Sequence, residues 1–193
     1  MRHPFLSSQI CVILGHQGGL THMKFSWDGT KLFTGSRKEH EIFCWDIRYL
    51  STVLYSLRRD SDTNQRIYFD TNFYTNYLVS GGQDGHVRFY DLGEIANSIE
   101  TNSDGSGDSS ESRQPTFAFK AHQDCVNGVA LHPFYPLLAS CSGERKFRAL
   151  NENDDEDCSF FGKHVEFENA LKLWWLTDRS EYNLATGDCN RTA

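Results

Sequence analysis

The sequence predicts an all-β fold built from a repeated unit of short strands. Short apolar runs alternate with turn signals such as Asp28-Gly29, and these runs are too short for helices. The unit also returns along the chain, because Trp45-Asp46 closes one copy and Tyr90-Asp91 closes the next, 45 residues later. This offset is at the upper end of the period of about 40–45 residues found in one class of four-stranded repeat.

Gly15-His16 and Trp45-Asp46 enclose three short apolar runs, which is typical of the WD repeat, the unit that forms one blade of a β-propeller. We therefore predict a partial WD-repeat β-propeller, with about three blades of an expected seven. The blades are expected at residues 9–46, 53–91 and 116–176, in one domain of residues 1–176. Because three blades do not close a ring, we expect a fragment of a longer protein rather than closure with other copies.

Each predicted unit begins with the outer strand of its own blade and continues with the innermost strand. The outer strands are expected at residues 8–14, 53–57 and 116–119. The innermost strands are expected around Met23 and Phe25, at residues 65–70 and at residues 126–131.

Two polar insertions and a polar tail interrupt the strand pattern. Residues 93–114 predict a disordered loop rich in Ser, Gly, Asp and Asn, residues 148–166 form an acidic insertion, and residues 177–193 form the tail. Residues 94–111 and 152–157 hold ten of the 26 acidic residues, so the other 16 face 19 Lys and Arg residues. The net charge of −7 therefore conceals a mildly basic folded part.

Several classes of function are disfavoured by the sequence. No apolar run approaches the roughly 20 residues that cross a bilayer, so no membrane partner is expected. The six cysteines include no CxxC pair and mostly lie in apolar runs, which favours buried free thiols over disulfides or metal. No nucleophile elbow, phosphate-binding loop or HExxH motif occurs. We expect no enzyme activity, cofactor, metal or small-molecule substrate.

Polar and aromatic residues recur at matching positions of the three units. In a WD blade, such residues form a buried hydrogen-bond network, and we favour this interpretation over a catalytic triad. The full set is missing from every unit, so partial networks are expected. Their members are His16, Thr34 and Trp45 in the first unit, Ser80, Asp84 and Tyr90 in the second, and His122, Ser140 and Trp174 in the third.

Loops at one end of the blades are expected to carry most basic side chains. Blade geometry places on this face the loops at residues 15–19, 36–40, 58–64, 83–85, 120–125 and 142–168. One-sided basic clustering suits phosphate binding, although a solvated basic rim is the alternative and the acidic residues 152–157 share this face. The candidate RNA-binding residues are Arg37, Lys38, Arg58, Arg59, Arg66, Lys120, Arg145 and Lys146, whereas the opposite face receives Arg48 and Arg113.

Five stretches of the chain resemble the C-terminal blades of the telomerase Cajal body protein family, also called WD-repeat protein antisense to p53. They are GHQGGLTHMKFSWDG, GSRKEHEIFCWDIR, TNQRIYFD, CVNGVALHP and LLASCSGERKF, in the same order as in that family. TNQRIYFD, and GHQGG followed by Thr-His, are not general features of WD repeats. The resemblance runs from about Cys11 to Trp175.

The resemblance implies a non-enzymatic RNA-binding scaffold. Such a protein would bind small Cajal body RNAs and telomerase RNA, and would associate with H/ACA ribonucleoprotein proteins and telomerase components. It would direct these ribonucleoproteins to Cajal bodies and support telomerase assembly and telomere maintenance. The implied location is the nucleus and the Cajal body, and a cytoplasmic fraction is compatible with the resemblance. The alternative is a generic WD-repeat scaffold for protein–protein interaction without RNA binding.

Overall fold

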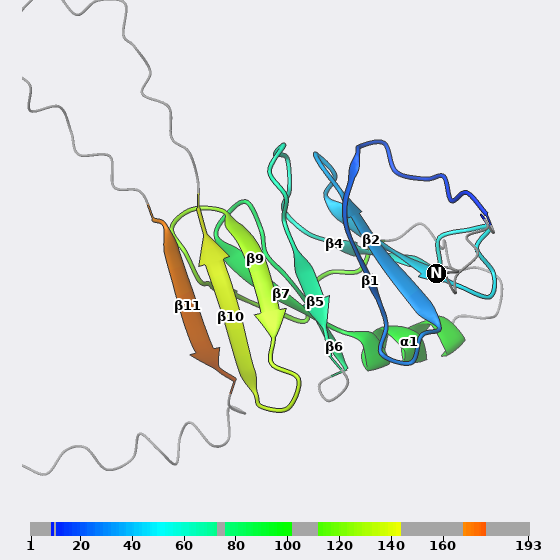
Figure 1. The fold of residues 1–193 in the computed structure, drawn as a ribbon. Helices are drawn as coiled ribbons and strands as arrows, with labels where there is room; N and C mark the ends of the chain where they lie inside the picture. Colours follow the sequence, from blue (N-terminus) through cyan, green and yellow to red (C-terminus); the bar gives the residue numbers. More distant parts are fainter. Residues whose placement is uncertain (1–8, 10, 73–75, 102–111, 144–167, 177–193) are drawn as a thin grey trace, which may run out of the picture.

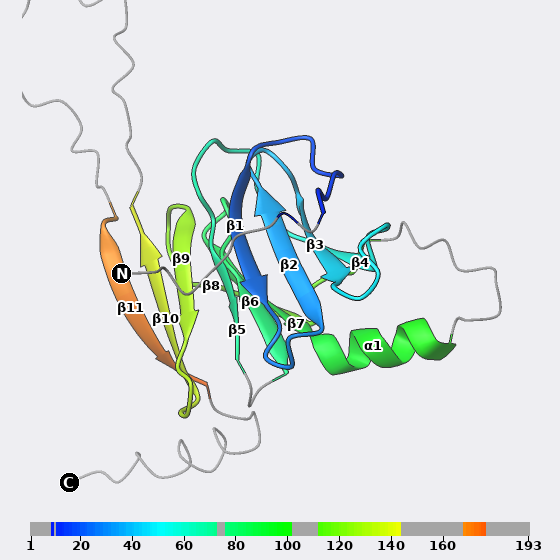
Figure 2. The same cartoon turned by 45° about the vertical axis from the view of Figure 1, so that its right-hand side comes forward.

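The structure, a computed structural model, describes residues 9, 11–72, 76–101, 112–143 and 168–176. Their strands form three antiparallel sheets that stand side by side (Figure 1). The innermost strands of the three sheets are neighbours, and the sheets spread outward from them like blades (Figure 2). The predicted all-β class and the partial propeller of about three blades are confirmed.

The first sheet has four strands in sequence order, and the second sheet repeats this arrangement. The first contains β1 (Leu20–Phe25), β2 (Lys31–Ser36), β3 (Glu41–Asp46) and β4 (Tyr55–Arg58). The second contains β5 (Phe69–Thr71), β6 (Tyr77–Ser80), β7 (His86–Asp91) and β8 (Phe117–Lys120), with helix α1 (Leu92–Thr101) between β7 and β8.

The third sheet has three strands among the described residues, in the order β11-β10-β9. They are β9 (Val126–Leu131), β10 (Leu137–Ser142) and β11 (Ala170–Trp175). The predicted acidic insertion at residues 148–166 and the tail at residues 177–193 lie outside the described residues. No helix within the described ranges is long and apolar enough to cross a membrane.

The outer strand of each sequence unit completes the sheet of the unit before it. β4 pairs with β3 and β8 pairs with β7, although we assigned residues 53–57 and 116–119 to the blades that follow them. Consecutive antiparallel strands pair readily because one connection brings them together. The sheets therefore span residues 20–58, 69–120 and 126–175, about one strand later than the sequence units.

Two further strand predictions need correction. In the stretch expected to form an outer strand, the described residues 9 and 11–14 are not in a strand. These residues precede the first sheet, and the described chain offers no earlier sheet for them to join. The innermost strand predicted at residues 65–70 is also shorter than expected: β5 covers only Phe69–Thr71.

The hairpin turn between β1 and β2 forms as the sequence predicts. Both the Ser26 hydroxyl, at 2.5 Å, and the Thr30 hydroxyl, at 2.7 Å, donate to the Asp28 carboxylate. Gly29 follows with a φ of 69°, a conformation that side chains rarely adopt. This turn ends β1 and leaves Trp27 exposed.

Apolar side chains fill the two spaces between the sheets. A fully buried aliphatic or aromatic side chain stabilises a fold by about 1.5–3 kcal/mol, so these layers hold the blades together. The layer between the first and second sheets contains Phe33, Ile42, Leu57, Phe69 and Leu78. The layer between the second and third sheets contains Val79, Val87, Val126, Leu138 and part of Trp174.

The two outward flanks of the described sheets also carry apolar side chains. Met23 and Phe25 of β1 are more than half exposed, on the side of the first sheet that faces away from the second. Leu171, Leu173 and Trp175 of β11 are exposed in the same way on the third sheet. Contiguous apolar strips of this kind mark surfaces that another domain or blade can cover.

Helix α1 overturns part of the disorder prediction for residues 93–114. The Asp91 carboxylate caps the helix by accepting the N–H groups of Gly93, at 2.9 Å, and Glu94, at 3.1 Å. Leu92 and Ile95, about one turn apart, are buried in the layer between the first and second sheets. The two apolar residues form a short helical face, which the polar residues after them obscured in the sequence.

The end of the same insertion returns to the edge of the first sheet. The N–H of Arg113 donates to the Ser56 carbonyl and the Arg113 carbonyl accepts the N–H of Arg58, both at 2.8 Å. Arg113 therefore lies beside β4, and the prediction that it belongs to a loop on the opposite face is wrong. Main-chain hydrogen bonds to the edge of β4 fix the position of Arg113. The order of strands and loops in the sequence does not predict such pairing.

Replacing Ile95 with alanine should lower the free energy of unfolding by about 2–3 kcal/mol, because it leaves a cavity where α1 meets the core. Urea denaturation followed by tryptophan fluorescence measures the change. Asn97→Ala is the matched control, since Asn97 is exposed on the same helix and should change stability by less than about 0.5 kcal/mol. Equal effects of the two substitutions would contradict the docking of α1.

Candidate nucleic-acid interface

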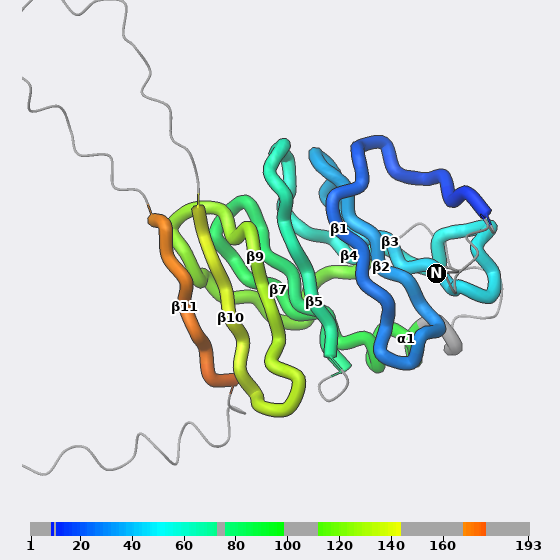
Figure 3. The backbone as a smooth tube through the Cα atoms, in the orientation of Figure 1, coloured from blue at the N-terminus to red at the C-terminus, as the bar shows by residue number. Residues whose placement is uncertain are grey.

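The five fully described loops of the predicted face open at the same end of the sheets, and most of the sixth, residues 144–167, lies outside the described residues. Every odd-numbered strand begins there and every even-numbered strand ends there (Figure 3). Hydrogen bonds join neighbouring loops into one surface, which we call the loop face. The donors and acceptors are Arg37 N–H to Gly19 O, Lys38 N–H to Thr63 O, Gln83 N–H to Asp60 O and Val126 N–H to Gly82 O.

Five of the eight candidate RNA-binding side chains are exposed at the loop face. They are Arg37, Lys38, Arg58, Arg66 and Lys120. The Lys120 ammonium also donates to the Asp84 carbonyl at 2.8 Å, which holds this side chain across the second sheet. Arg145 and Lys146 lie outside the described residues.

Arg59 is a structural residue, and its assignment to an RNA-binding surface is wrong. Its side chain is only 2% exposed. The guanidinium donates to the Ser36 carbonyl at 2.7 Å and to the Ile67 carbonyl at 3.2 Å, and so ties β2 to the segment before β5. Burial lowers the pKa of Arg59 to about 10. Neighbouring residues at the end of a strand point to opposite sides, so Arg58 meets solvent while Arg59 turns inward.

Carboxylates share the loop face with the basic side chains. Two of them are engaged inside the protein: Glu39 contacts His16, and Asp84 pairs with the Arg88 guanidinium at 2.7 Å. Asp60, Asp62 and Asp124 also lie on these loops, and Asp62 is exposed. The positive excess at this face is therefore smaller than the basic residues alone suggest.

An aromatic pair lies beside Arg66 where the loop face meets the innermost strands. Tyr68 is 37% exposed, and its ring contacts the His22 ring edge-on with centroids 4.7 Å apart. His22 also lies within hydrogen-bond distance, 2.9 Å, of the Phe69 carbonyl. Burial lowers the pKa of His22, which favours the neutral ring.

The first blade contains a continuous network of hydrogen-bonded polar side chains. His16 lies between the Glu39 carboxylate and the Thr34 hydroxyl, with Nε2 of the ring 2.7 Å from Thr34 Oγ1. Trp45 Nε1–H donates to the same hydroxyl oxygen at 2.8 Å. Because a carboxylate can only accept, His16 Nδ1 carries the proton of that contact. Ser36 also donates to Glu39.

The third blade repeats this network with different residues. His122 Nε2 lies 2.8 Å from Ser140 Oγ, and His122 Nδ1 lies 3.1 Å from the Glu168 carboxylate. Trp174 Nε1–H donates to Ser140 Oγ at 2.8 Å. The hydrogen bond from Lys172, together with those from the Gln123 N–H and His122, lowers the pKa of Glu168 to about 2.

The second blade does not assemble its predicted network. Ser80 Oγ donates to the Gly81 carbonyl, and the Tyr90 hydroxyl donates to the Arg58 carbonyl. Asp84 instead accepts from both terminal nitrogens of Arg88, at 2.9 and 2.7 Å. The loop before β5 has no histidine at the place of His16 or His122, and His86 lies 2.9 Å from Asp84 instead, so no imidazole links Ser80 to a carboxylate.

Comparison with known proteins identifies the repeat. Residues 7–46, 68–91 and 113–148 match the family model described as WD domain, G-beta repeat. The chain belongs to this WD-repeat family.

The chain is 42% identical over 174 residues to telomerase Cajal body protein 1 of Bos taurus, covering 87% of this chain and 30% of that protein. It is 40% identical over 173 residues to the protein of the same name from Homo sapiens, covering 87% and 29%. The chain therefore spans about 30% of the length of these curated relatives. The resemblance inferred from the sequence is confirmed.

The solved structure of U3-55K supports the fold. It aligns with a TM-score of 0.52 at 19% sequence identity, covering 69% of this chain and 36% of that chain. At this identity the likeness concerns the fold alone.

The networks of the first and third blades link a hydroxyl, an imidazole and a carboxylate in the order that hydrolases use for catalysis. Their hydroxyls are nevertheless unsuited to attack a substrate. Thr34 and Ser140 are only 5% and 1% exposed, and each oxygen already accepts a tryptophan N–H. Among the described residues, no group of three His, Cys, Asp or Glu side chains could hold a metal ion. The described networks therefore stabilise the blades.

The sequence predicted only partial networks and did not single out the glutamates of the first and third blades. Glu39 and Glu168 complete the first and third networks, so this expectation is wrong for both blades. A signal was present, because each glutamate stands six positions before the tryptophan of its blade, Trp45 or Trp174. In both blades the carboxylate comes from a glutamate in the segment before the closing strand, β3 or β11.

Ser140→Ala should lower the free energy of unfolding by about 2–4 kcal/mol, because it leaves His122 and Trp174 without their shared partner in a buried site. Differential scanning calorimetry measures the loss. Ser142→Ala is a close control: Ser142 is buried on the same strand, but its hydroxyl has no partner among the described residues. The control should retain or raise stability, and equal losses would argue against the network.

Glu168→Gln should flatten the acid side of the stability profile. The pKa of Glu168 is depressed in the folded state, so its charge stabilises the fold above the unfolded value of about 4.5. That contribution is lost as the pH falls from about 5 toward 2. Urea titrations across this range should show a steeper loss for the unmodified chain than for the variant. Parallel profiles would contradict the role of the Glu168 charge.

Proposed function

We propose that this chain forms part of a WD-repeat scaffold that binds RNA through the loop face. The expected ligands are small Cajal body RNAs and telomerase RNA, and the scaffold would direct these ribonucleoproteins to Cajal bodies. The observation that carries the proposal is the exposure of Arg37, Lys38, Arg58, Arg66 and Lys120 on one end of rigid sheets. Basic side chains neutralise phosphates and release counterions, which drives RNA binding.

The shape of the loop face also suits RNA. Proteins read RNA sequence mostly in single-stranded loops, by stacking bases on aromatic rings and hydrogen-bonding their edges. Tyr68 offers a partly exposed ring next to Arg66, and the rigid strand β5 begins immediately after it. The loops between strands supply further donors and acceptors on a fixed frame.

The similarity to proteins named telomerase Cajal body protein 1 supports the choice of RNA and of location. On this proposal the protein works without covalent chemistry, resides in the nucleus and in Cajal bodies, and associates with H/ACA ribonucleoprotein proteins and telomerase components. Since the chain spans about 30% of those relatives, it would supply a part of the complete binding surface.

A second candidate is a WD-repeat scaffold that binds proteins and no RNA. The carboxylates among the same loops favour it, because exposed Asp62 and half-buried Asp60 would repel phosphates. RNA binding is the stronger proposal because five exposed cations outnumber these acids in the described loops.

Arg37→Gln combined with Arg66→Gln should weaken binding of a labelled small Cajal body RNA by about tenfold at moderate salt. Losing two phosphate contacts should also reduce the slope of log K against log salt by about 1–2. Fluorescence anisotropy over a range of salt concentrations measures both quantities. The side chains are exposed, so folding should be unaffected.

Lys31→Gln combined with Arg48→Gln is the matched control, because it removes the same charge from the opposite end of the first sheet. This control should keep the affinity and the salt slope of the unmodified chain. Equal losses in the two double variants would refute the loop face as the binding surface. Absence of salt-dependent RNA binding by the unmodified chain would refute RNA binding and favour the protein scaffold.

A further inference from the structure

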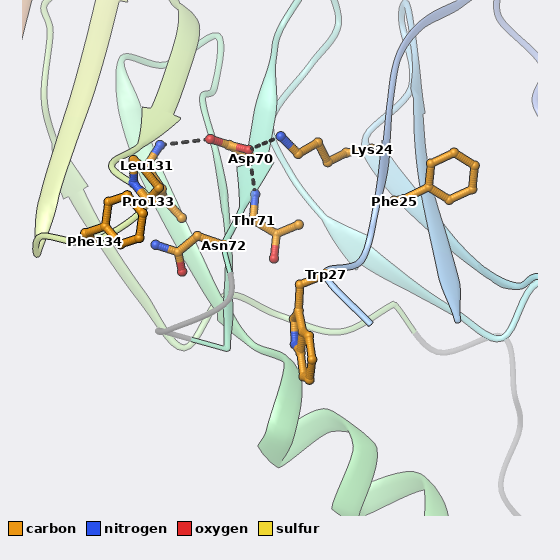
Figure 4. A pocket seen from close by; sticks show the side chains of 9 residues that line it. All are labelled: Lys24, Phe25, Trp27, Asp70, Thr71, Asn72, Leu131, Pro133 and Phe134. Atoms are coloured by element: carbon orange, nitrogen blue, oxygen red, sulfur yellow. Dashed lines mark hydrogen bonds and ion pairs between the residues drawn. The ribbon is translucent and has the colours of Figure 1, made fainter. Parts of the chain in front are cut away.

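A pocket opens at the end of the sheets opposite the loop face, which we call the turn end. Its volume is about 460 Å³, and it lies where the innermost strands β1, β5 and β9 end (Figure 4). Its walls come from three separate segments of the chain, at residues 24–27, 70–72 and 131–134. The folded arrangement of the three blades therefore creates the pocket, and none of the candidate RNA-binding residues lines it.

Large aromatic side chains stand on opposite sides of this pocket. Trp27 extends from the β1–β2 turn and Phe134 from the β9–β10 turn, and the two are 57% and 72% exposed (Figure 4). Leu131 and Pro133 add apolar surface next to Phe134. Exposed aromatic rings around a concave apolar site are the usual anchors for a large apolar group of a ligand.

Thr71 presents a buried hydroxyl to the pocket. The residue is only 7% exposed, and its Oγ1 has no hydrogen-bond partner among the described residues. The oxygen points into the space between Trp27 and Asn72 (Figure 4). A buried hydroxyl without a partner is unfavourable, so a ligand that supplies a donor or acceptor there gains a hydrogen bond without breaking another.

The charge of the turn end differs from that of the loop face. Lys24, the basic residue of the pocket, is paired with Asp70 at 2.9 Å. Asp28, next to Trp27, stays ionised because hydrogen bonds from Ser26 and Thr30 lower its pKa to about 2. Carboxylates outnumber cations among the described residues of this end: Asp28, Asp46, Asp70, Asp91 and Glu94 stand against Lys24, Lys31 and Arg48. Such a surface repels phosphates and attracts basic groups.

We propose that this pocket binds a segment of a partner protein that carries one large apolar side chain flanked by basic residues. The apolar side chain lies between Trp27 and Phe134, and a main-chain group of the segment hydrogen-bonds to Thr71 Oγ1. Basic flanking residues lie along the carboxylates of the turn end, beginning with Asp28. An apolar anchor with charged flanks is a common form of peptide recognition. The proposal is independent of RNA binding at the loop face.

The test uses the complete chain and a labelled glycine-serine peptide that carries one tryptophan between arginines. Fluorescence anisotropy should show saturable binding that weakens about tenfold when alanine replaces the peptide tryptophan. Glutamates in place of the arginines should weaken binding by a similar factor, because they meet the carboxylates of the turn end. An oligouridine RNA should not displace the peptide.

Substitutions in the chain test whether the peptide binds in this pocket. Trp27→Ala should weaken binding about tenfold, and Thr71→Val should weaken it about fivefold without loss of thermal stability, because the hydroxyl has no other partner in the described chain. Tyr49→Ala is the matched control and should bind normally, since Tyr49 is an exposed aromatic residue that does not line the pocket.

Three results would overturn the proposal. They are unchanged peptide affinity of the Trp27 variant, displacement of the peptide by the RNA, and no binding of the tryptophan peptide at up to about 1 mM. A purely structural role of Thr71 would appear as a lower melting temperature of Thr71→Val with unchanged peptide affinity.

Discussion

A twisted sheet with apolar side chains on both faces is stable only when both faces are covered, and this constraint governs the whole molecule. The second sheet meets the condition, since the first and third sheets cover its two faces. The first and third sheets meet it on one side. Their other sides retain exposed apolar strands, typified by Phe25 and Leu173. Exposed apolar strips of this kind are surfaces that another domain or blade can cover.

Polar groups inside the blades follow the complementary rule that a buried polar atom needs a partner. His16 and His122 each connect a hydroxyl to a glutamate, and a tryptophan N–H donates a hydrogen bond to the same hydroxyl oxygen. In a low-dielectric site such linked hydrogen bonds strengthen one another, and they fix loops relative to strands. Arg59 serves the same purpose between the first two sheets by bonding to two carbonyl groups. The rigidity of the loop face depends on these internal contacts.

The two ends of the sheets present different chemistry because different connections meet there. Loops between blades and loops before the closing strands share one end and carry exposed arginines and lysines. Hairpin turns meet at the other end, where aspartates such as Asp28 form the turns and aromatic residues follow the strands. This difference underlies our two proposals, which assign RNA to the basic end and a basic peptide segment to the acidic end.

The sequence by itself determined the class of fold, the number of repeats and the end of the sheets at which the described loops of the loop face open. These properties follow from local periodicity, turn residues and the repeated Trp-Asp or Tyr-Asp closure, all of which depend on near neighbours in the chain. The histidine, hydroxyl and tryptophan of the two complete networks could be named for the same reason.

Only the tertiary structure decided which side chains are available. It buried Arg59 and exposed its neighbour Arg58, because strand orientation and interblade packing set the direction of each side chain. In the structure, each outer strand pairs with the preceding sheet, and the residues after Asp91 form a helix that packs on the core. Glu39, Glu168 and the pocket around Thr71 likewise arise from contacts between segments far apart in the chain, which no local pattern specifies.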